Sequence, residues 1–199
     1  SLLARALAQP AAACSARVEP ARLAPYYAVD PRPLWLTVEG PTARAHALRR
    51  ALSQAAQDGL DPAGYLLDAI HARWEDARPA ARACLEVLLT AAFDRYSRDL
   101  RLGQLAPAQA DPTWLLRPDP FDPVAALQAV APDAQFTTLL ESLAPPHFLY
   151  QRLRAAYVRS RQVMAQGGWQ PLPAGPALAP GMRHAQVPLL RQRLRGEGD

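Results

Sequence analysis

The sequence lacks any long apolar run. Half of its 199 residues are apolar, yet no stretch approaches the ~20 consecutive apolar residues that a membrane-spanning helix needs. We therefore predict no membrane-spanning segment. A chain of this length and composition can bury a hydrophobic core, and it is typical of a globular protein rather than a disordered one.

Lysine and asparagine are also absent. All 22 basic residues are arginines, and the formal net charge is +4. The abundance of alanine and proline indicates a GC-rich coding bias, so the arginine excess is weak support for a polyanionic partner. Nucleic-acid-binding domains usually gather their charge on one stripe, whereas here acidic residues separate arginines along the whole chain. We predict no nucleic-acid partner.

Cysteine is scarce, because the chain holds only Cys14 and Cys84. Two cysteines cannot form a disulfide framework. Two alternatives remain open: a single Cys14–Cys84 disulfide in an oxidising compartment, or two unpaired thiols with Cys84 on the buried face of a helix. The small apolar stretch 1–14 is consistent with the remnant of a removed signal peptide or with an ordinary short helix.

No recognisable catalytic or metal-binding pattern occurs. None of the four histidines pairs with another histidine or a cysteine at metal-ligand spacing, and no glycine-rich phosphate loop is present. Neither cysteine stands in a motif that would activate a thiolate. We predict no catalytic residue, no cofactor and no metal site, and we expect that this chain is not an enzyme by itself.

The hydrophobic periodicity is helical almost everywhere. We predict an all-α fold, an irregular multi-helix bundle around a long central helix, with only short extended pieces such as 34–38. Thr42 is a candidate N-cap and Gly59 a candidate stop for the helix between them. Asp61 and Pro62 begin a second helix, over 62–74. A later helix, over 145–168, is expected to turn Leu149, Leu153, Ala156, Tyr157 and Val163 inward.

The segment 78–103 is predicted to be the central helix. Its apolar face is broad enough to touch neighbours on more than one side. That face comprises Cys84, Leu85, Leu88, Leu89, Ala92, Phe93, Tyr96 and Leu100. The acidic residues Glu86, Asp94 and Asp99 alternate with arginines, and we interpret them as solvated i,i+3 and i,i+4 pairs worth a few tenths of a kcal/mol each.

The tryptophans are spread over predicted loops and helix ends. At such places an aromatic ring either stacks on a sugar or closes the end of a helical core, and we favour the core role for any single one. An exposed patch that contacts a glycan or a protein partner would comprise Trp114, Tyr150, Arg154 and Trp169.

Five segments, in this order, resemble the scaffold region of the large periplasmic murein L,D-transpeptidases of Gram-negative bacteria. The resemblance covers 23–199, nearly the whole chain, and no single segment is specific alone. The segments are LAPYYAVDPRPLWLT, ALRRALSQAAQDGLDPAGYLL, LEVLLTAAFDRYSRDLRLGQLAP, LAPPHFLYQRLRAAYVRSRQVMAQGGWQPLPAG and LAPGMRHAQVPLLRQRLRGEGD.

The resemblance implies a domain plan and a place in the cell. It implies an N-terminal extension over 1–22, a helical scaffold domain over 23–168, a Pro/Gly-rich linker over 169–182 and, over 183–199, the first helix of a truncated peptidoglycan-binding-like unit. The family's catalytic Ser-x-Gly-Cys and His-Gly motifs do not occur here, so neither cysteine is matched as a nucleophile. A periplasmic location, with peptidoglycan or cell-wall proteins as partners of the parent protein, is implied.

The resulting expectation is a non-catalytic scaffold that positions the catalytic and peptidoglycan-binding parts of a cell-wall cross-linking enzyme. Two alternatives stay open. One is a stand-alone periplasmic adaptor that acts by protein–protein contact, which a stop codon just after Asp199 would favour. The other is a helical domain that binds peptidoglycan directly, and failure to bind sacculi would count against it.

Overall fold

A computed structural model describes the chain over residues 2–9, 14, 18–105, 109, 111, 113, 119–130, 133–169 and 171–197. The chain forms two compact units, Ser1–Arg154 and Ala155–Asp199. The regular elements of the described ranges are all helical, apart from one isolated bridge between Leu36 and Pro41. The predicted all-α fold is therefore confirmed.

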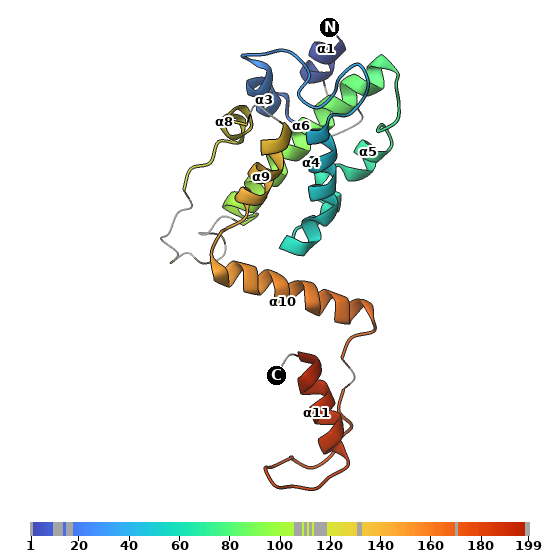
Figure 1. The fold of residues 1–199 in the computed structure, drawn as a ribbon, viewed down its shortest axis with the longest axis vertical. Coiled ribbons are helices and arrows are strands. Elements are labelled where there is room, and N and C mark those ends of the chain that lie inside the picture. Colours follow the sequence, from blue (N-terminus) through green and yellow to red (C-terminus); the bar gives the residue numbers. More distant parts are fainter. Residues whose placement is uncertain are drawn as a thin grey trace. The chain divides into compact units, whose positions relative to one another are not determined.

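The described part of the first unit is built from helices (Figure 1). The α-helices are α1 (Leu2–Ala8), α3 (Pro20–Leu23), α4 (Ala43–Gln54), α5 (Leu67–His71), α6 (Pro79–Leu102), α8 (Pro123–Gln128), α9 (Asp133–Leu143) and the start of α10 (Phe148–Ala165). The described residues also form the 3-10 helices η1 (Ala24–Tyr27), η2 (Ala55–Asp58) and η3 (Pro62–Tyr65).

Helix α6 is the central helix, as predicted. It contacts α1, α3, α4, α5, α8, α9 and η3, and all eight residues of its predicted apolar face are buried. Phe93 lies at the centre of an aromatic cluster, with ring centroids 5.8 Å from those of both Trp35 and Phe136. Neighbours surround α6 because its buried face spans more than one stripe of the helix.

Side-chain caps and left-handed residues set the helix ends. The Thr42 hydroxyl accepts from the Ala45 N–H at the start of α4, and Gly59 ends η2 with a φ of 75°. Both predictions are confirmed. The helix predicted over 62–74 is instead broken into η3 and α5, because Leu66 adopts a φ of 58°. This left-handed conformation is costly for a branched residue and cannot continue a helix.

The predicted inner face of α10 is wrong. No residue of α10 is buried, and Leu149, Leu153 and Tyr157 are exposed. The apolar residues do recur at helical spacing, as the sequence indicated. Periodicity reports only that a helix has an apolar face; it does not report whether another part of the same chain covers that face.

The second unit holds the end of α10 and α11 (Gln186–Glu197). Between them, the Pro/Gly-rich segment is attached to the start of α11 by a nearly buried glutamine. The Gln186 side-chain amide donates to the Pro173 carbonyl at 2.6 Å. A Cβ at Gly175 would stand 2.6 Å from that amide, so a larger residue there would have to displace the Gln186 side chain.

Candidate functional site

Buried carboxylates on α6 organise the polar interior of the first unit. Glu86 and Asp94 are 1% and 3% exposed, so our interpretation of these two residues as solvated is wrong. The predicted i,i+4 pairs do occur between Asp94 and Arg98 and between Asp99 and Arg95. The sequence did not reveal the burial of Glu86 and Asp94, because each lies four residues from an arginine, Arg82 or Arg98. This is the spacing of an ion pair on a helix surface. Burial of a charge is tolerated only when donors surround it, and both residues have such partners.

Glu86 accepts hydrogen bonds from a backbone turn and from a tyrosine. The Leu34 N–H donates to Oε1 at 2.5 Å, the Trp35 N–H donates to Oε2 at 3.1 Å, and the Tyr27 hydroxyl donates to Oε1 at 2.9 Å. The carboxylate thereby holds the turn 34–36 against α6. Burial raises the pKa of Glu86 to about 7, although the backbone N–H groups of Leu34 and Trp35 oppose this shift.

Thr90, one turn further along α6, extends this network. The Trp35 indole N–H donates to its hydroxyl at 2.9 Å, and the Thr90 and Tyr27 hydroxyl oxygens lie 2.6 Å apart. One donor order runs from Trp35 through Thr90 and Tyr27 to Glu86; in the other, the single Thr90 hydroxyl proton goes to the Glu86 backbone carbonyl, 2.9 Å away. Since every member has a partner, the network fixes the rotamers of these buried side chains and can stabilise one arrangement of the core.

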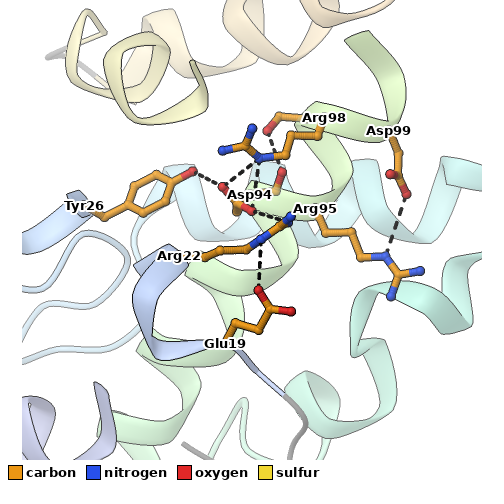
Figure 2. A network of polar contacts seen from close by, with 8 residues as sticks. Glu19, Arg22, Tyr26, Asp94, Arg95, Arg98 and Asp99 are labelled. Carbon is orange, nitrogen blue, oxygen red and sulfur yellow. Dashed lines mark hydrogen bonds and ion pairs between the residues drawn. The ribbon is translucent and has the colours of Figure 1, made fainter. Parts of the chain in front are cut away.

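Asp94 is the second centre (Figure 2). The Tyr26 hydroxyl donates to its Oδ1 at 3.0 Å, Arg98 approaches from the next turn of α6 at 3.2 Å, and Arg22 reaches it from α3 at 3.4 Å. Arg22 also pairs with Glu19 at 3.2 Å. Asp94 therefore joins the segment 19–26 to the middle of the central helix.

Two further carboxylates repeat the tyrosine pairing. The Tyr65 hydroxyl donates to Asp99 Oδ2 at 2.9 Å, and the Tyr150 hydroxyl donates to Asp58 Oδ1 at 2.9 Å. Arg154 donates to the same Asp58 oxygen at 2.6 Å. The Asp58 contacts secure the start of α10 to the end of η2, within the first unit.

The structure brings together two of the four residues predicted to form an exposed patch. Tyr150 and Arg154 converge on Asp58, and both are only half exposed. Trp169 lies in the second unit, where the Arg193 guanidinium stacks over its ring at 5.0 Å. Trp114 lies outside the described residues. Trp35 and Trp74 are buried, in the core role favoured for the tryptophans.

A cavity of about 430 Å³ adjoins the Asp58 cluster. Its lining comes from α4, η2, α6, α9 and α10, all within the first unit. The polar groups on its wall are Arg50, Gln54, Asp58, Tyr96, Thr137, Glu141, Gln151 and Arg154. Sequence reasoning identified Arg154 alone among them, because the others are distributed over five separate elements.

Cys14 and Cys84 form a disulfide, with their Cα atoms 5.3 Å apart. Of the two alternatives left open by the sequence, the structure contains the bridge. It attaches residue 14 to the buried face of α6, and Arg73 donates to the Cys14 carbonyl at 3.1 Å. A sulfur in a disulfide is not a thiolate nucleophile.

Within the described ranges, no three histidine, cysteine or acidic side chains are grouped closely enough to hold a metal ion. Among the helices of those ranges, none combines the length and apolar character required to cross a bilayer.

These features define an all-helical domain in which buried carboxylates connect a central helix to the segments around it. A family model described as "Scaffold domain" matches residues 21–156. The chain belongs to this family, and that membership supports a non-catalytic scaffold role. No curated protein and no solved structure gives a significant match to the chain.

Proposed function

We propose that this chain is the scaffold region of an L,D-transpeptidase-like cell-wall enzyme of the periplasm. Its task would be to hold the catalytic and peptidoglycan-binding parts of the parent protein in position against peptidoglycan. Membership of the Scaffold domain family, over residues 21–156, is the observation that carries the proposal. The order of the five segments resembling murein L,D-transpeptidases supplies the enzyme class.

The resembling segments also supply the polar contacts that connect the domain. The first contributes Tyr26, Tyr27 and Trp35, and the third contributes their acceptors Glu86, Thr90 and Asp94. The second and fourth meet where Asp58 binds Tyr150 and Arg154. Because hydrogen bonds connect these segments in the folded domain, each segment depends on the others for its structure. This supports reading the resembling segments as parts of one domain.

The disulfide favours the proposed compartment. Disulfides persist in oxidising environments such as the bacterial periplasm and are rare in the cytosol. The bridge also bears on catalysis, because the parent reaction implied by the resemblance is acyl transfer through a cysteine thioester. Both cysteines of this chain are engaged with each other, so we propose that the nucleophile lies elsewhere in the parent protein.

The gene's complete reading frame tests this proposal. We expect a downstream region with His-Gly and Ser-x-Gly-Cys motifs, and we expect the purified 199-residue chain to form no cross-linked product from disaccharide tetrapeptides. A stop codon just after Asp199 would favour the stand-alone adaptor instead. Cross-linking by the isolated chain would contradict the non-catalytic assignment.

A further inference from the structure

The cavity beside Asp58 differs from the rest of the polar interior in its hydrogen bonding. Tyr96 is only 5% exposed, yet among the described residues its hydroxyl has no hydrogen-bond partner. In the described part of the chain, every polar side-chain atom that is shielded from solvent has a hydrogen-bond partner. The Tyr96 hydroxyl must therefore reach solvent-accessible space, and Tyr96 lines this cavity.

Opposite charges without protein partners lie on two other walls. Arg50 projects from α4 and Glu141 from α9, and both line the cavity. Neither takes part in any ion pair or hydrogen bond within the ranges that the structure describes. Since no ion pair joins them to each other, a ligand that reaches both would need an anionic group for Arg50 and a cationic group for Glu141.

The remaining wall offers further polar contacts and one positioned arginine. Arg154 is held by Asp58 and by Gln57, whose side-chain oxygen accepts at 2.8 Å. Among the described residues, no acceptor lies opposite the Nη1 of Arg154. Gln54 and Thr137 can each both donate and accept hydrogen bonds, as a peptide backbone requires. Ala47, Ala51, Leu100 and Leu140 supply apolar surface.

We propose that this cavity binds a short peptide that carries both a free carboxylate and a free ammonium group. The carboxylate would face Arg50 and Arg154, the ammonium would face Glu141, and the Tyr96 hydroxyl would contact the peptide backbone. A cavity of 430 Å³ lies within the range of small-ligand pockets. The lining itself supports this ligand class, whereas the choice of a cell-wall peptide as first probe rests on the proposed function.

The test is calorimetric titration of the purified chain with L-Ala-γ-D-Glu-meso-diaminopimelate. A matched control peptide has both of its amines, on alanine and on diaminopimelate, acetylated and its carboxylates amidated. We expect saturable binding of the free peptide and none of the blocked one. Tyr96→Phe, Arg50→Gln and Glu141→Gln should each weaken binding by about three- to tenfold. Arg5→Gln and Glu75→Gln, which make the same charge changes away from the cavity, should leave binding unchanged.

Three results would overturn the inference: no saturable binding at about 5 mM peptide, equal binding of the free and blocked peptides, or equal binding by wild type and all three cavity variants. Circular dichroism of each variant shows whether it is folded, and the three replaced side chains hydrogen-bond to nothing in the described structure, so folding should persist. None of these results alters the reading-frame test, so failure of the cavity and failure of the proposed function are distinguishable.

Discussion

The buried middle of α6 and the cavity near its C-terminal end use similar residues in opposite ways. Around Glu86 and Asp94, each tyrosine hydroxyl donates to a carboxylate of the protein. At the cavity, Tyr96 is equally buried, but its hydroxyl donates to none of the described residues. A paired polar group stabilises the fold, whereas an unpaired one that reaches a cavity is available to a ligand. The hydrogen bonding, and not the residue type, separates the two regions.

Removing the disulfide should lower the free energy of unfolding more than any other change proposed here. The bridge is anchored at Cys84 of α6, close to Glu86. The bridge closes a loop of 70 residues, and Cys14→Ser with Cys84→Ser should lower the free energy of unfolding by about 4 kcal/mol. Urea denaturation measures this. Dithiothreitol should have a comparable effect on wild type and none on the double variant. Unchanged stability in both experiments would mean that the bridge does not stabilise the fold.

The substitution Glu86→Gln should give the second-largest loss in the free energy of unfolding. An amide NH₂ in place of Oε2 cannot accept from the Trp35 N–H, so at pH 5 we expect a loss of about 3 kcal/mol in the free energy of unfolding. Glu75→Gln, at an exposed position, should cost about 0.5 kcal/mol or less. Equal losses for the two variants would contradict a central role for Glu86.

The same variant tests the titration of Glu86. Because its folded pKa is raised from 4.5 to about 7, the native state binds more protons than the unfolded state between these pH values. The contribution of Glu86 is therefore fully present below pH 4.5 and is lost as the pH rises through about 7. The stability gap between wild type and Glu86→Gln should narrow from pH 5 to pH 8. A widening gap would show that the pKa is lowered instead.

Asp94→Asn should cost about 2 kcal/mol in the free energy of unfolding. The substitution removes the charge that Arg22 and Arg98 share, while the Tyr26 hydroxyl keeps one acceptor oxygen. Thermal or urea unfolding measures the loss. Tyr26→Phe in the same background should add little, since the two groups belong to one network; a fully additive loss would contradict that coupling.

Asp58→Asn should lower the free energy of unfolding by less than Asp94→Asn does, about 1 kcal/mol, because Arg154 is partly solvated. The substitution weakens the attachment of the start of α10 and the placement of Arg154 at the cavity. Peptide binding should therefore fall together with stability. A loss of stability without any change in peptide affinity would show that the Asp58 contacts do not contribute to peptide binding at the cavity.

Local features of the fold could be predicted because they depend on neighbouring residues. The Thr42 cap, the Gly59 stop and the buried face of α6 each follow from short-range spacing. The break at Leu66 could not be predicted, because the only marker nearby is Gly64, and Gly64 does not adopt the positive φ. Leu66 is partly buried against the core, and a left-handed non-glycine residue persists only where the surrounding structure holds it there.

The site depended on long-range pairing that periodicity does not encode. Glu86 accepts from residues more than 50 positions away, and its spacing along α6 matches that of a surface residue. The apolar stripe of α10 gave the opposite error, since it suggested burial where the residues are exposed. Tyr150 and Arg154 were identified as contact residues, but their shared partner Asp58 lies more than 90 positions earlier.

The most direct measurement compares Tyr27→Phe with Tyr96→Phe. Each variant removes one hydroxyl from a buried ring, but the Tyr27 hydroxyl donates to Glu86, whereas Tyr96 lines the cavity. Urea denaturation should show a loss of about 1–2 kcal/mol for Tyr27→Phe and a change within about 0.5 kcal/mol for Tyr96→Phe. Only the second should weaken binding of the tripeptide. Equal stability losses, or weaker binding by the first variant alone, would contradict the division between a paired interior and an open cavity.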